Sequence, residues 1–305
     1  MMTIQKLRYI IEIVNCGSIS EAAKRLFVAQ PSLSSAVREL EQQIGFEIFL
    51  RTNKGVVLSS AGAEFLGYAR QIVEQADLMD QRYLNAKPSR QYFSVSTQHY
   101  AFVVNAFVNL VKGYGSNEYE FTFRDTRTHE ILEDVRNLRS EIGVLYINDF
   151  NAKVLGHIIQ ENGLEFHPLF IAKPHIFVST VNPLAKKTFV TLEDLEEYPC
   201  LSFEQGEYNS FYYSEEILST LSHQKSIHVS DRATIFNLMI GLNGYTISTG
   251  VINADLNGDN IVAVPLKVEE MITVGWIDHK KVTLSRLAEQ FVQELKEAVK
   301  DVDHP

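Results

Sequence analysis

The chain has 305 residues, of which 45% are hydrophobic and 22% charged, a balance typical of two or three soluble globular domains. No apolar run approaches the 18 or so residues that cross a bilayer, and residues 1–6 lack a signal-peptide pattern, so we expect a cytoplasmic protein with no membrane partner. Cys16 and Cys200 lie too far apart in sequence to indicate a disulfide framework or a metal-ligand cluster, and we expect two reduced thiols that pack as small apolar residues.

The net charge of −10 is unevenly distributed along the chain. Residues 1–58 carry seven basic and five acidic side chains and therefore a charge of +2, which leaves −12 for the remaining residues. This asymmetry predicts a DNA-facing N-terminal end and an acidic remainder.

Residues 1–58 have the pattern of short helices followed by a hairpin. Apolar residues recur at helical spacing from Ile4 to Val14, and Gly17 ends that helix. Ser18 and Glu21 have the spacing of a capping box and begin a second helix. Residues 27–30 are short enough for a turn, and Pro31 fits the start of a third helix because its missing N–H costs nothing there. The segment is therefore predicted to be a helix-turn-helix.

The third helix is expected to present short or amide-bearing side chains that approach base edges in the major groove. Taken alone, this pattern is equally typical of a solvated helix face. The candidate DNA-contacting residues of this helix are Gln30, Pro31, Ser32, Ser34, Ser35 and Arg38.

The residues that follow favour DNA binding. Two apolar runs, 46–50 and 56–58, flank Asn53-Lys54-Gly55, which has the residue types of a tight turn. We predict a hairpin wing in which Arg51 and Lys54 contact phosphates. A winged helix-turn-helix is a far more specific pattern than a polar helix.

Residues 18–62 resemble the LysR family of transcription regulators. The resemblance implies double-stranded DNA, a small-molecule effector and RNA polymerase as partners, and a homodimer or homotetramer. The chain departs from the family at Ala29, where the family usually has a serine that touches the DNA backbone, so that phosphate contact is in doubt. The matching residues are Gly17-Ser18, Ala22-Ala23, Leu26, Gln30-Pro31-Ser32-Leu33-Ser34, Leu40-Glu41, Ile44-Gly45, Phe49, Arg51-Thr52, Leu58 and Ala61-Gly62.

Residues 59–88 are expected to form a linker helix that carries dimerisation. About 28 helical residues span roughly 42 Å, which suits a spacer between two DNA-binding heads. The alternative is an amphipathic helix packed on its own domain. The predicted seam steps by four and three residues through Phe65, Ala69, Ile72, Ala76, Met79 and Tyr83.

Residues 89–305 alternate apolar strands with helical stretches, which implies parallel sheets with helices on their faces. Two crossings between lobes are expected, with lobe I at 89–172 and 266–305 and lobe II at 173–265. This plan is similar to the α/β two-lobed effector domain of LysR regulators and of periplasmic binding proteins. The chain therefore divides into a winged helix-turn-helix domain at 1–58, the linker helix and this effector domain.

The effector is expected between the lobes, where strands end and helices begin. Each serine or threonine there is as well explained by helix capping, and His99 by a satisfied, partly buried histidine. The candidate effector-binding residues are Ser96, Thr97, Gln98, His99, Thr126, Thr128, Ser202 and Phe203. The four aromatic residues within 208–213 are interpreted either as a lid over the cleft or as a buried packing stretch.

The run 140–146 is similar to a branch of the LysR family found in Gram-positive cocci. Members of that branch are associated with methionine and cysteine uptake and with capsule or wall adaptation. The resemblance implies a sulfur amino acid or its precursor as the effector.

Other classes of protein fit the sequence less well. No glycine-rich phosphate loop, metal cluster or nucleophile elbow is present in the sequence, so we expect no enzyme activity, no cofactor and no metal. Asp125, Asp134 and Asp149 are interpreted as caps or solvated positions. A DNA-architectural protein would not need two lobes, and a free solute-binding protein would not carry the N-terminal domain.

Overall fold

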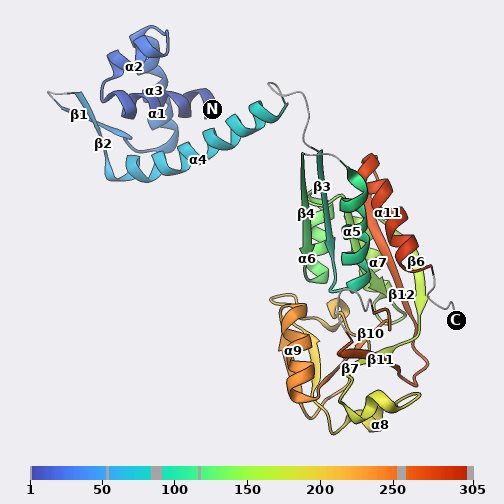
Figure 1. Ribbon diagram of the computed structural model, residues 1–305. Helices are drawn as coiled ribbons and strands as arrows, with labels where there is room; N and C mark the ends of the chain where they lie inside the picture. The colour runs from blue at the N-terminus through green and yellow to red at the C-terminus, as the bar shows by residue number, and fades with distance from the viewer. Residues whose placement is uncertain (1, 53–54, 84–90, 116–117, 253–258, 301–305) are drawn as a thin grey trace. The chain divides into compact units, whose positions relative to one another are not determined.

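A computed structural model describes residues 2–52, 55–83, 91–115, 118–252 and 259–300 of the chain. The chain forms two compact units, Met1–Ser89 and Arg90–Pro305, and each is described by itself (Figure 1).

The first unit contains helices and one hairpin. Thr3 caps the first helix by accepting a hydrogen bond from the Lys6 N–H, and Gly17 ends it with a left-handed φ of 65°. Ser18 caps the second helix in the same way, through the Glu21 N–H. The elements are α1 (Ile4–Cys16), α2 (Ile19–Arg25), α3 (Gln30–Ile44), β1 (Phe49–Thr52), β2 (Gly55–Leu58) and α4 (Ser60–Tyr83).

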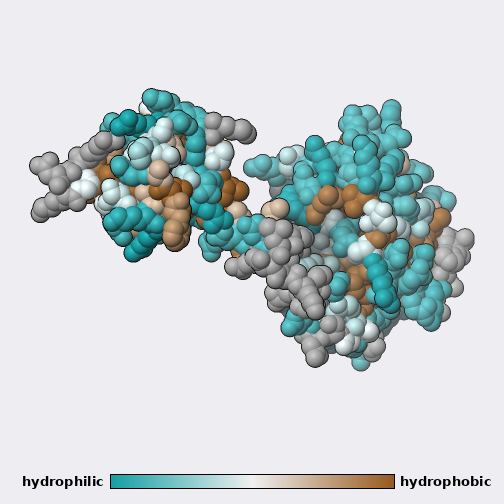
Figure 2. Space-filling view, turned by 90° about the horizontal axis from the view of Figure 1, so that it is seen from above, coloured by the Kyte–Doolittle hydropathy of each residue, from teal (hydrophilic) through white to brown (hydrophobic). Residues whose placement is uncertain are grey.

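The two strands of this unit pair antiparallel with Phe49 opposite Leu58, so the predicted hairpin is confirmed. Leu33, Val37 and Leu40 turn inward from α3 into one small core, and the helix presents its other faces to solvent. Hydrophobic groups also reach the surface of this unit among the polar ones (Figure 2).

One side of α4 packs on its own domain, which corrects part of the predicted seam. Ala69 is 1% exposed and packs with Val73 against Leu7 of α1, so it cannot lie in a contact between two chains. Ile72 and Met79 are exposed in the single chain, which is what we expect of residues that contact a second chain in a dimer. Phe65 and Ala76 are half-buried, and the side chain of Tyr83 lies outside the described residues.

Leu78 and three other large apolar side chains of α4 are exposed, and those three have the spacing 68, 72 and 79. Tyr68 is 62% exposed, Ile72 43% and Met79 64%. The intervals of four and seven residues keep these three on one side of the helix. The two interpretations of α4, a dimerisation helix and a helix packed on its own domain, are therefore compatible. One side of α4 packs on its own domain, and another side exposes apolar side chains to solvent.

The second unit contains two five-stranded sheets, one in each lobe (Figure 1). Lobe I has the strand order β4-β3-β5-β12-β6, with α5 and α11 on one face and α6 and α7 on the other. Its elements are β3 (Gln91–Thr97), α5 (Ala101–Tyr114), β4 (Tyr119–Asp125), α6 (Thr128–Arg136), β5 (Ile142–Ile147), α7 (Ala152–Glu161), β6 (Leu164–Ala172), β12 (Ile272–His279) and α11 (Arg286–Ala298).

Lobe II has the strand order β11-β7-β10-β8-β9. Its elements are β7 (His175–Ser179), the 3₁₀ turn η1 (Pro183–Lys186), α8 (Leu192–Leu195), β8 (Cys200–Phe203), η2 (Phe211–Tyr213), β9 (Ser226–Val229), α9 (Arg232–Leu242), β10 (Tyr245–Ser248) and β11 (Ile261–Pro265).

Both sheets are mixed, whereas the alternation of strands and helices predicted parallel sheets. In lobe I, β3 runs parallel to β4 and β5, but β12 is antiparallel to β5 and β6. The reason is topological, because β12 enters lobe I from the opposite end after the chain has passed through lobe II. Sequence periodicity does not report this reversal of direction.

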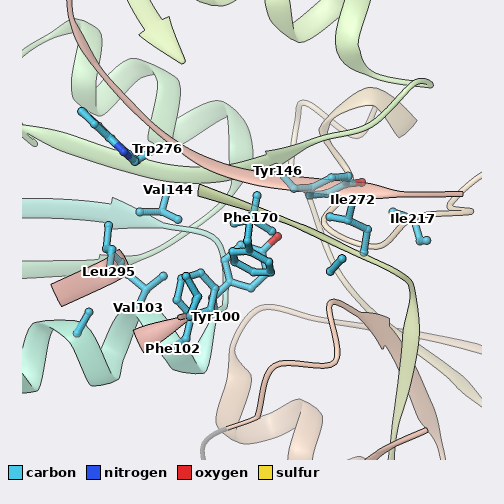
Figure 3. Close-up of a cluster of buried hydrophobic side chains, with 14 of the residues drawn as sticks. Tyr100, Phe102, Val103, Val144, Tyr146, Phe170, Ile217, Ile272, Trp276 and Leu295 are labelled. Carbon is cyan, nitrogen blue, oxygen red and sulfur yellow. The ribbon is translucent and has the colours of Figure 1, made fainter. Parts of the chain in front are cut away.

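A single large apolar cluster reaches from lobe I into lobe II. Tyr100, Phe102 and Phe170 lie close together in lobe I, and Ile217 extends the cluster toward the other lobe (Figure 3). This continuity holds the strand ends of the two sheets near each other, which is where the candidate ligand residues lie.

Candidate nucleic-acid interface and ligand cleft

The helix-turn-helix is built from α2, a turn at residues 26–29 and α3. Phe27 makes the turn with a positive φ of 53°, and its side chain is 96% exposed. Ala29 occupies the cap position of α3 and supplies no side-chain hydrogen bond, so the first N–H groups of α3 have no side-chain cap. These backbone N–H groups at the start of α3 are therefore available to hydrogen-bond acceptors of a binding partner.

The predicted base-reading residues lie on the surface of α3. Gln30, Ser32 and Ser35 are exposed, and Ser34 is half-buried within 3.4 Å of the Gln30 amide. Pro31 is exposed within the first turn, where it stiffens the helix start. The face is therefore open and polar.

Arg38 of α3 differs from the basic side chains of α1 and α2. Lys6 pairs with Glu39, Arg8 with Asp77, Lys24 with Glu21 and Arg25 with Glu12. Arg38 is exposed, and it makes no ion pair within the part of the chain that the structure describes. Its charge is available to a phosphate. Lys54 and the side chain of Arg51 lie outside the described residues, and their phosphate contacts remain predictions.

Buried contacts fix the wing against α3. The Glu41 carboxylate accepts hydrogen bonds from the Ile48 N–H at 2.7 Å and the Phe49 N–H at 3.1 Å. A Cβ on Gly62 would lie 2.2 Å from the Ile48 carbonyl oxygen, so only glycine fits there. The helix and the base of the hairpin are thus held in one orientation.

The strand-end hydroxyls of lobe I are used inside the lobe, which corrects their assignment as ligand contacts. The Ser96 side chain is fully buried and its hydroxyl lies 2.7 Å from Asp134 and 2.8 Å from Ser140. The Thr97 hydroxyl is also buried and donates to the Gln98 carbonyl oxygen. Asp134, which we interpreted as a cap or solvated position, is a buried acceptor that also pairs with Arg139.

Gln98 and Thr128 likewise join elements within lobe I. The Gln98 amide donates to the Thr128 hydroxyl at 2.6 Å, and its oxygen accepts from the Tyr146 N–H and the Tyr100 hydroxyl. Both residues are about 1% exposed. Thr126 is half-buried, and its hydroxyl bonds to Glu130 on the first turn of α6. These side chains therefore bond within lobe I rather than toward a ligand, and none of them caps α5 or α6.

His99 and Phe203 do meet between the lobes. Their rings stack with centroids 3.8 Å apart and planes 4° from parallel. Nδ1 of His99 lies 2.8 Å from Glu215 of lobe II, and Nε2 lies 3.8 Å from Asp125 of lobe I. Ser202 lies elsewhere in lobe II, with its hydroxyl 2.8 Å from His228.

Two opposing effects set the charge of His99. Burial lowers its pKa, but the hydrogen bond to Glu215 and the charges of Glu215 and Asp125 together outweigh burial, so the pKa lies above its ordinary value. Burial raises the pKa of Asp125, although the charges of His99 and Arg232 partly offset this. The imidazole thus favours its charged form between two carboxylates.

A cavity of about 40 Å³, which we call the cleft cavity, adjoins this contact. It is lined by His99 and Tyr100 of lobe I and by Phe203, Glu215 and Arg232 of lobe II, among others. Nη1 of Arg232 is buried and has no hydrogen-bond partner within the described residues. Arg232 as a whole is half-buried, but a buried guanidinium nitrogen without a hydrogen bond is costly, and a carboxylate is its natural partner.

The aromatic segment 208–213 links the lobes across their surface. Tyr208 stacks on His129 of α6 at 3.5 Å, and Tyr212 stacks on Phe150 at 4.8 Å. Tyr213 packs on the core between α6 and α7. Tyr208, Phe211 and Tyr212 remain substantially exposed, so the segment is neither fully buried nor a cover over the cleft cavity.

Sequence reasoning missed Arg232 and Glu215. Arg232 is the first residue of α9 and directly follows Asp231, which caps the helix by accepting a hydrogen bond from the Thr234 N–H; that N-cap residue is the sequence signal for its position. Glu215 lies in a segment without periodicity, and no sequence signal distinguishes it from other acidic residues. Both cysteines are free, and burial raises the pKa of Cys200 to about 12.

A winged helix-turn-helix and a separate two-lobed α/β unit define a DNA-binding regulator with a ligand-binding domain. Residues 4–63 match the bacterial regulatory helix-turn-helix proteins of the lysR family, and residues 117–300 match the LysR substrate binding domain. The second match alone covers more than half of the chain. The chain belongs to the LysR family of transcription regulators, which are not enzymes.

Curated relatives agree with this assignment. The chain is 26% identical over 283 residues to the transcriptional regulator YnfL of Escherichia coli, covering 90% of this chain and 91% of YnfL. It is 24% identical over 196 residues to the regulator MetR of Escherichia coli, covering 64% of this chain and 58% of MetR. The match to ClcR of Pseudomonas putida, 38% over 77 residues, spans only 25% of this chain and 26% of ClcR.

The fold agrees with a solved structure, the Corynebacterium glutamicum OxyR C206 mutant. The TM-score is 0.53 at 17% sequence identity, and the match covers 98% of this chain and 93% of that one. None of the helices in the described part of the chain has the length and hydropathy that a membrane span requires.

Proposed function

We propose that this LysR-family regulator responds to an α-amino acid bound between the lobes of its effector domain. The unpartnered Nη1 of Arg232 at the cleft cavity carries the proposal. Arginine binds a carboxylate through parallel hydrogen bonds and is therefore suited to the acid group of such a ligand.

The charges around Arg232 favour a zwitterion over a simple acid. Glu215 lines the same cavity, and Asp125 lies close enough to Arg232 for their charges to interact. A cationic ammonium group of the ligand would replace protonated His99 as the partner of these carboxylates. The aromatic face of Phe203 suits an apolar side chain.

The size of the cleft cavity supports a ligand-dependent change in the lobes. A volume of about 40 Å³ holds little more than one water molecule, whereas a small-molecule site has roughly 300–1,000 Å³. An amino acid would therefore enter a more open arrangement in which His99 leaves Glu215 and Phe203. A ligand that binds one arrangement better than the other shifts their populations and can change DNA binding.

Within the amino acids, we propose a sulfur amino acid or its precursor. The support is the resemblance of residues 140–146 to the branch associated with methionine and cysteine uptake. The relative MetR covers only part of the chain at 24% identity and adds little. We further propose that the regulator acts in the cytoplasm as a homodimer or homotetramer, and that RNA polymerase is a partner.

Calorimetric titration of the full chain tests the ligand class. L-methionine, L-homocysteine, L-cysteine and O-acetyl-L-serine serve as probes, with L-methioninamide as a probe that lacks the carboxylate. At least one amino acid should bind, the amide should bind at least tenfold more weakly, and Arg232→Gln should remove the difference.

Arg286→Gln is a matched control, because Arg286 is also the first residue of a capped helix but is exposed in α11. It should leave binding unchanged. Equal affinities for the acid and the amide in the native chain would contradict a carboxylate site at Arg232.

A further inference from the structure

A second cavity, of about 510 Å³, lies within lobe II. We call it the lobe II pocket; it is lined by β8, β9, the end of β10 and residues of the segment 204–223. Phe203, Glu216 and Ile247 line both this pocket and the cleft cavity, so they form the wall between the two. The volume falls in the range of sites that bind small molecules.

The chemistry of this pocket differs from that of the cleft cavity. Among the residues that the structure describes, no lysine or arginine lines it. Burial raises the pKa of Glu216 well above its ordinary value, which favours the neutral carboxyl form. Two histidines also line the pocket: burial lowers the pKa of His223, which favours its neutral form, and Nδ1 of His228 lies 2.8 Å from the Ser202 hydroxyl. An anionic ligand would therefore lose its hydration there without gaining a lysine or arginine partner. The lining therefore favours an uncharged ligand.

The pocket combines apolar surface with hydrogen-bonding groups. Phe211, Leu218 and Leu221 supply apolar walls. Gln205 is 7% exposed, and its side-chain oxygen is buried without a hydrogen-bond partner in the part of the chain that the structure describes. Buried amide oxygens are normally paired, and a donor group on a ligand would satisfy this one.

We propose that the lobe II pocket is a second ligand site, which binds an uncharged, partly apolar molecule with an amide-type hydrogen-bond donor for Gln205. This site is separate from the proposed amino-acid site and does not depend on it.

A contact pathway joins this pocket to the cleft. The Gln205 amide donates to Glu215 at 3.3 Å, and Glu215 accepts from the His99 N–H at 3.1 Å and lies 2.8 Å from its Nδ1. Phe203 forms the pocket wall and stacks on His99. A ligand that moves Gln205 or Phe203 changes the contacts that hold the lobes together, and so links the two sites.

Calorimetry on the full chain tests the site with two pairs of probes. Indole-3-acetamide and nicotinamide are uncharged, and indole-3-acetate and nicotinate have the same ring systems with a carboxylate. At pH 7.5 at least one amide should bind tenfold or more tightly than its acid. No binding of either amide at millimolar concentration, or equal binding of the acids, would overturn the proposal.

Substitutions in the lobe II pocket test whether the amides bind there. Ser226 lies exposed at the rim of the pocket on β9, and Ser226→Trp should fill the pocket and weaken amide binding at least tenfold. Leu221→Trp, from the opposite segment, should do the same if Ser226→Trp misfolds by circular dichroism. Thr220→Trp, at an exposed position outside the lining, should bind as the native chain does. Retained affinity in both pocket-filling variants would place the amide elsewhere and refute the site.

Discussion

At the residue scale, we expect the predicted DNA-binding surface to contain one group that reads bases and another that contacts phosphates. Gln30 is an exposed amide at the start of α3, which can bond bidentately to adenine, whereas Arg38 is an exposed, unpaired cation. Genome-wide footprinting of the full chain supplies the cognate DNA for comparing them.

We predict that Gln30→Ala costs about 1–3 kcal/mol of binding free energy on cognate DNA and less on random DNA. Arg38→Ala should weaken both alike and lower the salt slope by about one unit. Fluorescence anisotropy over a range of salt concentrations measures both. Gln42→Ala, at an exposed position near the other end of α3, is the control; equal losses on the two DNAs for Gln30→Ala would reject base reading.

His99 should make the effector domain sensitive to pH. Because its pKa in the folded chain lies above the ordinary value near 6.5, its stabilising contribution is complete below that value and is lost as pH rises through the folded pKa. The stability difference between the native chain and His99→Gln should therefore shrink between pH 6 and pH 8.5. Thermal unfolding in phosphate buffer measures it.

His157→Gln serves as the control, because His157 is exposed on α7 and pairs only with Glu161. Because an exposed ion pair contributes little to stability, His157→Gln should unfold at nearly the same temperature as the native chain at either pH. A difference for His99→Gln that stays constant or widens toward high pH would mean that protonated His99 does not hold the lobes together.

At the element scale, α4 carries the apolar side that its own domain leaves uncovered. We predict that Ile72→Asp lowers the oligomeric state in sedimentation and greatly weakens operator binding, because a carboxylate at this position would be buried without a partner in a dimer. Gly67→Asp adds the same charge on another side of the helix and should have little effect. A fully dimeric Ile72→Asp chain would show that the exposed residues of α4 do not form the contact.

The sequence was most informative where short-range rules decide the structure. Gly17, Ser18 and Pro31 mark helix boundaries through local backbone geometry, and the helix-turn-helix and wing follow from them. The predicted seam of α4 was wrong at Ala69 and stays a prediction elsewhere, because periodicity detects apolar positions but not which surface covers them. Ala69 packs on α1, which only the tertiary structure determines.

The ligand site was harder to predict for the same physical reason. A hydroxyl at a strand end can bond inward or toward a ligand, and Ser96 bonds inward to Asp134. The contact of His99 with Glu215 joins residues 116 positions apart, and no local pattern encodes it. His99 and Phe203, which we expected between the lobes, line the cleft cavity. Arg232 lines it as well, but only the tertiary structure shows this.

At the scale of the whole molecule, the proposed function requires that binding in the effector domain changes binding to DNA. The family provides both domains, and the contacts of His99 with Glu215 and Phe203 provide an arrangement of the lobes that a ligand can displace. Coupling between two sites of this kind is typically about 1–3 kcal/mol, or roughly 5- to 150-fold in affinity.

Operator binding by the full chain, measured by fluorescence anisotropy with and without a saturating amino acid, tests this account most directly. The amino acid is the one that binds in calorimetry, and the DNA comes from footprinting. The native chain and Arg286→Gln should change operator affinity at least fivefold when the amino acid is added, and Arg232→Gln should bind the operator normally without responding. An Arg232→Gln chain that responds as fully as the native protein would contradict the account.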